Sequence, residues 1–337
     1  MPEYVYPSAQ RIMQIEQDLL PMLRPEDPIF DHLPVETTSD DLLRWEQFDN
    51  YRGLQQIRGL NGDPPKVQRV GAKGYLMEPG YYGEQVPIDE KELTRRAAIG
   101  TFGDRVDLMD LVTQIQEHLI TREYARIRQV LWTLCTAGTF SVSSLDGQLL
   151  QTDTFPLQTF TSSPPWNTLT TGAPLTDLRA MKLLGRGHSI DFGTAATAYG
   201  NQATVNVMLN NQNPNDLFGR RGQYGVTINT LVASNQIFLE NALPRIEVMD
   251  DTYYDDHGAL QLYIPNGYLV VFGKRPNNRP LGNYRMTFNA QTGGGGSYMK
   301  IVDNTTRDVP RKIVVHRGHN GGPVIYFPSG VIVMKVY

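Results

Sequence analysis

The residues with the most obvious chemical potential form an acidic group in the last third of the chain. Asp250, Asp251, Asp255, Asp256 and His257 fall within one stretch of eight positions. Carboxylates at such short spacings hold Ca²⁺ or Mg²⁺ when a loop turns them toward one another. The Asp-x-Asp-x-Asp-Gly spacing of a calcium-binding loop is absent, however. The sequence therefore favours a solvated acidic turn, and a metal-dependent hydrolase that uses this cluster is the alternative.

Two histidines near the C-terminus, His316 and His319, flank an Arg-Gly pair. Histidines at this spacing bind zinc best from a helix, with a third ligand from elsewhere in the chain. Here they follow a β-rich run, and the glycines of Gly318–Gly322 predict a tight turn. These glycines could cradle an anion through their backbone amides, but no helix start follows and Pro323 interrupts the segment. We expect neither a metal site nor an anion site here.

Nucleophiles are equally scarce. Cys135 is the only cysteine, which excludes an intramolecular disulfide and suits a reducing cytosol. It lies beside Leu131 and Leu134, so we expect a buried core thiol rather than an activated one. Ser329 lacks the Gly-x-Ser-x-Gly elbow, and neither a P-loop nor a Gly-x-Gly-x-x-Gly pattern occurs. The sequence thus predicts no catalytic residue, no cofactor and no metal, and a protein that is not an enzyme.

Composition narrows the remaining classes. The 337 residues carry a net charge of −4, which argues against a basic, groove-reading DNA-binding protein. A hydrophobic content of 40%, with 31 glycines and 22 prolines, predicts many turns and extended segments. No apolar run of about 18 residues occurs, so no transmembrane helix is expected. The N-terminal residues do not have the pattern of a secretory signal.

The clearest element that could position side chains is a long helix from Asp104 to Thr136. Apolar residues recur at the i, i+3, i+4, i+7 spacing of one helical face. Acids crowd the first turn, where the helix dipole favours anions, and Gly138 follows the predicted end. At about 1.5 Å per residue the segment would span about 50 Å, several times the usual helix length. This length predicts a structural spine.

Residues 66–88 are predicted to form an extended hairpin. Two extended segments flank a turn in which Pro79 and Gly80 occupy the positions that a type II turn prefers. The hairpin has only a thin apolar stripe, and an isolated hairpin of this kind is marginal in water. Residues 1–65 scatter their apolar residues among prolines and acids. We therefore expect an arm that lies on another surface and orders mainly on assembly, and a flexible tail is the alternative.

Shorter elements complete the prediction. Helices are expected at Asp89–Ala98, Leu175–Leu184, Thr194–Asn211 and Ile228–Asn241, and strands dominate from Arg245 onward. The Pro265-Asn266-Gly267 segment predicts a hairpin turn between the strands that flank it.

Several blocks of this chain, taken in order, resemble the phage major capsid proteins of the lambda-like E family. The most informative blocks are Leu243–Gly258, Tyr263–Arg275 and Arg317–Val336. Further support comes from the stretches IDEKEL (Ile88–Leu93), LWTLCTAGTFSV (Leu131–Val142), WNTLTTGAPLTDLRAM (Trp166–Met181) and NVMLNNQNPND (Asn206–Asp216). The resemblance covers roughly four-fifths of the chain, residues 66–337, and is weakest over residues 1–65.

This resemblance implies the Hong Kong 97-type capsid fold, an α+β fold with an N-terminal arm, an extended loop, a peripheral domain with a long spine helix and an axial domain. Carried onto this chain, residues 1–65 would be the arm and 66–88 the extended loop. Residues 89–185, with the spine helix at 104–136, would form the peripheral domain. Residues 186–300 would form the axial domain, and 301–337 would return to the peripheral domain as strands.

The function that the resemblance implies is that of the major capsid protein of a tailed double-stranded DNA phage. Such a protein self-assembles, in the host cytoplasm, into the hexamers and pentamers of an icosahedral head shell and ends in the virion. A separate scaffolding protein, a portal and an optional decoration protein would be its partners. Packaged DNA would be contacted non-specifically, and no membrane is involved. An encapsulin-like protein compartment of the same fold is the alternative.

In this family the extended loop lies on an adjacent subunit, which assigns assembly contacts on this chain. Charged contacts would come from Arg69, Lys73 and Glu84. Apolar contact area would come from Tyr75, Leu76, Tyr81 and Tyr82.

Overall fold

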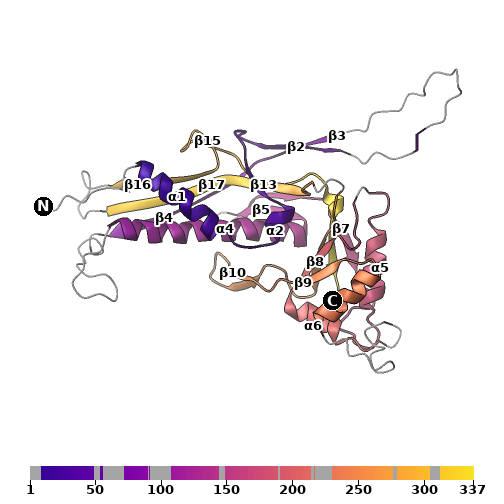
Figure 1. Ribbon diagram of the computed structural model, residues 1–337. Coiled ribbons are helices and arrows are strands. Elements are labelled where there is room, and N and C mark those ends of the chain that lie inside the picture. Colours follow the sequence, from indigo (N-terminus) through magenta and orange to yellow (C-terminus); the bar gives the residue numbers. More distant parts are fainter. Residues whose placement is uncertain are drawn as a thin grey trace, which may run out of the picture.

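Two β-sheets lie next to each other, and one long helix runs along the first of them (Figure 1). The computed structural model describes residues 9–48, 54–55, 72–89, 91, 108–143, 149–188, 190–213, 216, 230–275, 279–303 and 312–337. Helices and strands alternate irregularly along these residues, so the predicted α+β class is confirmed. Most of the helix predicted at 89–98 lies outside the described residues.

Helix α4 (Leu108–Ala137) is the predicted spine. Its 30 residues span about 45 Å. The helix ends where predicted: Gly138 has a φ of +68°, and its amide donates to the carbonyl of Leu134 at 2.8 Å. A positive φ suits glycine because it has no Cβ. The four residues predicted before Leu108 lie outside the described part of the chain.

The first sheet is built around β17 (Lys312–Ile325), which also packs against α4. Along one edge β17 pairs antiparallel with β4 (Gly80–Asp89). Along its other edge it pairs antiparallel first with β16 (Ser297–Asp303) and then with β13 (Gly282–Met286). Strand β1 (Val35–Thr37) adds in parallel to β13. One strand therefore joins segments from both ends of the chain.

The turn predicted at Gly318–Gly322 is wrong, because β17 continues through it as a paired strand. Two of these glycines instead allow neighbouring backbone segments to approach closely. A Cβ on Gly318 would lie 2.4 Å from the carbonyl oxygen of Tyr82, and one on Gly321 would lie 2.7 Å from that of Arg285. Glycine inside a strand marks such a close backbone approach. The local pattern looked like a turn because it does not reveal the neighbouring strands.

The second sheet has the strand order β7-β18-β12-β8-β9. The central strand β12 pairs antiparallel with β18, and the two strands carry mostly apolar side chains that are fully or almost fully buried. The helices α5, α6 and α8 pack their buried residues into the same cluster. The bounds are β7 Gln158–Thr161, β8 Thr197–Gly200, β9 Arg245–Val248, β12 Tyr268–Phe272, β18 Val331–Lys335, α5 Pro174–Leu183, α6 Gln202–Leu209 and α8 Leu231–Glu240.

The predicted domain boundaries cut across the two sheets. Strand β7 and helix α5, within residues 89–185, belong to the second sheet and its core. Strand β18, within residues 301–337, pairs with β12. Strand β13, within residues 186–300, pairs with β17, as does β16, which spans the predicted boundary at residue 300. Pairing between distant segments is set by tertiary contacts, so contiguous ranges do not follow the sheets.

The described residues also form four two-stranded ribbons, and each is antiparallel. They are β2 (Leu43–Phe48) with β3 (Ala72–Met77), β5 (Thr139–Ser143) with β6 (Leu149–Thr154), β10 (Thr252–Tyr254) with β11 (Leu260–Leu262), and β14 (Phe288–Asn289) with β15 (Gly294–Gly295). The β2–β3 ribbon projects away from both sheets in Figure 1.

The hairpin predicted over residues 66–88 is wrong. Its two strands exist, but β3 pairs with β2 and β4 pairs with β17. Pro79 and Gly80 are buried at the point where the chain leaves the ribbon and enters the first sheet. The extended ribbon is therefore made by β2 and β3. The long separation of these strands in sequence hid their pairing from a local reading.

Two predictions in the second sheet need similar correction. The Pro265-Asn266-Gly267 turn is present, and Gly267 has a φ of +80°, but its flanking strands pair elsewhere. The helix predicted at Thr194–Asn211 is shorter: β8 occupies its first part, and α6 begins after Asn201. The Asn201 side chain accepts a hydrogen bond from the amide of Thr204, which fixes this helix start. The predicted helices at α5 and α8 are confirmed.

The N-terminal segment is not a free arm over its described length. Helices α1 (Ala9–Leu23) and α2 (Ile29–His32) both contact α4, and β1 joins the first sheet. Ile29, Leu33 and Leu43 are completely buried. The apolar residues are few, as the sequence showed, but several of them enter the main core. The described side chains of α1, by contrast, are only half-buried or exposed.

We expect Leu131→Ala on α4 to lower the free energy of unfolding by about 2–5 kcal/mol, because it leaves a cavity in a close-packed core. Leu131 is 0% exposed and belongs to the main core. Urea unfolding of the purified chain measures the change. Leu183→Ala is the matched control, since Leu183 is 49% exposed, and a change within about 1 kcal/mol is expected there. Equal effects of the two substitutions would contradict the burial of this helix face.

Candidate assembly surface

Two of the four aspartates in the acidic cluster at residues 250–257 form ion pairs with arginines of the spine helix. Asp251 lies 2.5 Å from a guanidinium nitrogen of Arg128, and Asp256 pairs with Arg126. Figure 1 shows β10 extending beneath α4, where these pairs form. The solvated acidic turn predicted from the sequence is therefore also an attachment point for the β10–β11 ribbon.

The remaining acids shape the backbone of this turn. Asp255 accepts hydrogen bonds from the amides of Ala259 at 2.8 Å and His257 at 3.0 Å. Both backbone hydrogen bonds lower the pKa of the Asp255 carboxyl, and the one from Ala259 has the larger effect. Asp250 accepts from the amide of Gln202 at 3.3 Å. Over the described residues, no group of three or more His, Cys, Asp and Glu side chains is arranged to hold a metal ion.

The two C-terminal histidines lie on opposite faces of β17. Residues an odd number of positions apart on a strand point to opposite sides of the sheet, so His316 and His319 cannot share one metal ion. His319 is 1% exposed on the face toward α4. Its Nε2 lies 2.9 Å from the hydroxyl of Tyr284, and its Nδ1 lies 3.1 Å from the carboxylate of Glu123.

Glu123 of α4 is the centre of this buried polar cluster, and it is 8% exposed. One carboxylate oxygen accepts from Nε of Arg317 at 2.5 Å. The other accepts from the hydroxyl of Ser297 and faces His319. These partners come from β16 and β17, and Tyr284 joins from β13. A single helix residue thus connects three strands of the first sheet.

The charge on Glu123 is stabilised by these partners. Burial alone would raise the pKa of its carboxyl, but the hydrogen bond from His319 and the positive charge of Arg317 lower the pKa to about 2. Burial raises the pKa of the Tyr284 phenol well above its usual range, so this hydroxyl stays protonated. The cluster is built to hold a fixed ion pair. Nothing in its geometry brings a nucleophile to a substrate-sized opening.

The surroundings of Cys135 and Ser329 do not activate either residue as a nucleophile. Cys135 is completely buried, and burial raises the pKa of its thiol. Such a thiol is inert, as expected for a structural cysteine. Ser329 lies in a short 3₁₀ helix, η2 (Pro328–Gly330). The longest apolar stretch of any described helix is too short or too polar to cross a membrane.

The base of the β2–β3 ribbon is fixed by aromatic stacking. Trp45 of β2 lies directly opposite Tyr75 of β3, and their rings stack with centroids 5.2 Å apart. Phe155, which follows β6, also stacks with Trp45, at a centroid distance of 6.0 Å. Aromatic pairs of this kind contribute about 0.5–1.5 kcal/mol beyond their buried area. The ribbon therefore leaves the body of the protein in a defined direction.

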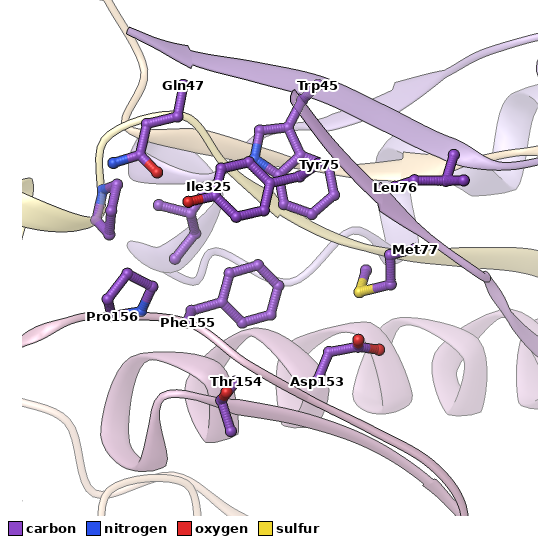
Figure 2. Close-up of a pocket in the computed structure, with 11 residues that line it drawn as sticks. Trp45, Gln47, Tyr75, Leu76, Met77, Asp153, Thr154, Phe155, Pro156 and Ile325 are labelled. Atoms are coloured by element: carbon purple, nitrogen blue, oxygen red, sulfur yellow. The ribbon is translucent and has the colours of Figure 1, made fainter. Parts of the chain in front are cut away.

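A shallow pocket lies where the ribbon meets the body (Figure 2). Figure 2 shows Tyr75, Phe155 and Ile325 gathered around it, with Pro156 at one side. Asp153 is the one carboxylate in the lining, and its oxygen accepts from the side chain of Gln151. The lining is mostly apolar and carries no general acid paired with a base. It suits packing better than catalysis.

The predicted contact residues divide into two groups. Lys73, Leu76 and Tyr81 are exposed, with Leu76 at 64% and Tyr81 at 69%. The other described residues contact their own chain, although Glu84 is also exposed. Glu84 forms a bidentate pair with Arg122 at 2.6 and 2.7 Å, Tyr82 packs on His319, and Tyr75 stacks on Trp45. Arg69 lies outside the described residues.

Solved structures of other proteins share this chain path. A protein assigned as the capsid protein of a prophage of Escherichia coli CFT073 matches with a TM-score of 0.63 and 14% sequence identity, over 98% of this chain and 99% of that one. A phage-related protein from Bordetella bronchiseptica RB50 matches with a TM-score of 0.55 and 9% identity, over 95% and 96% of the two chains. No protein-family model matches the sequence, and no curated protein matches it.

This is the Hong Kong 97-type phage capsid fold. The spine of this capsid fold was predicted from helical periodicity, and it is present as α4. The residues that attach the spine were missed. Glu123, Arg128 and Asp27 belong to buried or half-buried ion pairs, yet on the sequence they look like ordinary surface charges. One signal was available: Glu123 and Ile127 lie four positions apart, on the apolar stripe of the helix.

We expect the capsid-fold subunit to lose stability as the pH falls from about 5 to about 2, by about 3 kcal/mol through Glu123. The pKa of Glu123 is lowered from 4.5 to about 2. A lowered folded-state pKa stabilises the protein above the unfolded-state pKa, and this stability is lost as the pH falls through the folded-state value. Urea unfolding across this pH range measures the loss.

Glu123→Gln should be less stable near neutral pH by about 3–5 kcal/mol, because Arg317 stays buried without its counter-charge. This variant should also lose the part of the pH dependence that Glu123 supplies. Asp41→Asn is the control, since Asp41 is 78% exposed in its ion pair with Arg44, and it should keep the wild-type pH dependence. An unchanged acid sensitivity in Glu123→Gln would contradict the assignment.

Proposed function

We propose that this chain is the major capsid protein of a tailed double-stranded DNA phage and that many copies form an icosahedral head shell. The supporting observation is the fold, which the chain shares over 98% of its length with a protein assigned as a prophage capsid protein. The match extends over nearly the whole of both chains, which supports a common role for the complete fold rather than for one of its parts.

The ribbon gives an independent physical argument for self-association. A two-stranded ribbon is marginally stable in water unless it packs on another surface. The stack at Trp45 fixes only its base, while Lys73 and Leu76 on β3 remain exposed. A neighbouring copy of the chain would supply the missing surface. Permanent assemblies of this kind bury more than about 2,000 Å² per interface.

The structure supports a revised division of the chain. The peripheral domain would contain α4 and the sheet around β17, and the axial domain would contain the sheet around β12 with α5, α6 and α8. The extended loop would be the β2–β3 ribbon rather than residues 66–88. Lys73, Leu76 and Tyr81 remain proposed assembly contacts, because their side chains are exposed.

The partners follow from this role. Hexamers and pentamers of the same chain would form the shell during assembly in the host cytoplasm, with a separate scaffolding protein, a portal and an optional decoration protein. The net charge of −4 fits a shell that does not grip packaged DNA tightly. The hydrolase alternative loses support, because Asp251 and Asp256 are paired with arginines.

We expect the purified chain, expressed with its scaffolding protein if it needs one, to form closed icosahedral particles in negative-stain electron microscopy. Particles from infected or induced cells should contain double-stranded DNA, which nuclease treatment after lysis detects. Closed shells that carry a protein cargo and no DNA would instead identify an encapsulin-like compartment. A stable monomer under all assembly conditions would contradict both functions.

We expect the ribbon to be required for closure of the shell. Phe48 and Ala72 are paired at the end of the described ribbon, so residues 49–71 can be replaced by Asn-Gly, which favours a two-residue type I′ turn. The shortened chain should stay soluble, with a normal near-ultraviolet circular dichroism signal from Trp45 and Tyr75. It should form no closed shells.

Cross-linking provides a second measurement of the same ribbon. Amine-reactive reagents should join Lys73 to another copy of the chain in assembled particles and not in dissociated subunits. Lys73→Arg, which keeps the charge without a reactive amine, is the control and should remove these cross-links. Normal particles from the shortened chain, together with purely intrachain cross-links from Lys73, would rule out this role.

A further inference from the structure

Strand β9 forms one edge of the second sheet: it pairs with β8 on one side, and no other strand of the described residues pairs with it. Residues along a strand direct their backbone amides alternately to the two sides. Arg245 and Met249 donate to carbonyls of the β8 side, at Ala196 and Gly200. Ile246 therefore directs its amide and its carbonyl toward the open side of the sheet.

Asn235 of α8 occupies this open side. Its side-chain oxygen accepts from the amide of Ile246 at 2.9 Å, and its side-chain nitrogen donates to the carbonyl of Ile246 at 2.8 Å. One primary amide thus makes the two hydrogen bonds that a residue of an additional strand would make. Half-buried between the helix and the strand, the Asn235 side chain stands in the place of that strand.

Helix α8, which carries Asn235, is held against β9 by a buried side chain and by the turn that connects the two elements. Phe238 is completely buried in the same cluster as Ile246. The amide of Leu243 donates to the carbonyl of Phe238 at 2.8 Å, and the Asn241 side chain donates to the carbonyl of Ile237 at 2.8 Å. These contacts stop α8 and return the chain directly into β9. These contacts therefore fix the position of Asn235 along the edge of β9.

We propose that Asn235 is a specificity-determining residue for self-association, because it closes the edge of the second sheet to strand addition by another copy of this chain. Uncovered edge strands are ready templates for pairing with other chains. A subunit present at high local concentration must associate through its intended surfaces and not through such an edge. The inference goes beyond the proposed function and holds whichever particle the chain builds.

Substitutions at neighbouring positions can test whether Asn235 closes the edge, because they can block strand addition without replacing the hydrogen bonds between Asn235 and Ile246. Val248 lies on the same edge and is 38% exposed. A lysine placed there would block strand addition by charge, as edge lysines do in natural sheets. Gln236 follows Asn235 on the exposed side of α8 and provides a matched control position. The variants are therefore Asn235→Ala, Asn235→Ala with Val248→Lys, and Gln236→Ala.

The experiment uses the purified full-length chain under assembly conditions. Amide exchange at Ile246 should be about tenfold faster in Asn235→Ala than in wild type, because its hydrogen-bond acceptor is gone. Light scattering, thioflavin T binding and electron microscopy should show a severalfold rise in irregular, β-linked aggregates. Gln236→Ala should match wild type in all of these measurements.

The double variant separates edge closure from a purely structural role. It should keep the fast exchange at Ile246 and still return to the wild-type level of aggregates, since its lysine blocks the edge. Aggregates in Asn235→Ala at the wild-type level would overturn the proposal. So would a double variant that aggregates or fails to fold as severely as Asn235→Ala, because Asn235 would then serve only to hold α8 in place.

Discussion

The fold depends on the pairing of buried charges along one helix. Glu123 lies inside the protein and would be strongly unfavourable there without Arg317 and His319. Five residues further along, Arg128 pairs with the buried Asp27 of the N-terminal segment and with the exposed Asp251, which directly precedes β10. Buried ions tolerate little misplacement, because an unpaired partner is costly. The buried pairs therefore fix where the N-terminal segment and the first sheet sit on α4, and the Asp251 pair attaches the β10–β11 ribbon at the surface.

The packing around α4 also connects the projecting β2–β3 ribbon to both sheets. Trp132 of α4 is completely buried, donates a hydrogen bond to Asp27 and contacts Tyr199 and Phe272 of the second sheet edge-on. The same core contains Trp45 and Tyr75 from the base of the ribbon. The helix, both sheets and the ribbon thus share one core.

A shell-forming subunit needs some surfaces that associate and others that do not. The exposed strand β3 of the ribbon belongs to the first kind, with Leu76 open to solvent. The edge of β9 belongs to the second kind, since α8 covers it and Asn235 occupies the hydrogen-bonding groups of Ile246. Both are edges of β-structure, and the difference between them is whether the chain itself supplies a cover. This contrast fits controlled rather than indiscriminate association.

The sequence by itself determined the elements whose information is local. Helical periodicity predicted α4, and Gly138 marked its end, because both depend on residues within a few turns of one another. The short C-terminal blocks were sufficient to suggest the capsid fold. Strand partners were decided only by the tertiary structure. The pairing of β2 with β3, the passage of β17 through Gly318–Gly322, and the burial of Glu123 each depend on segments far apart in the chain. A local pattern carries no record of those distant contacts, and the free energy that selects them exists only once the segments meet.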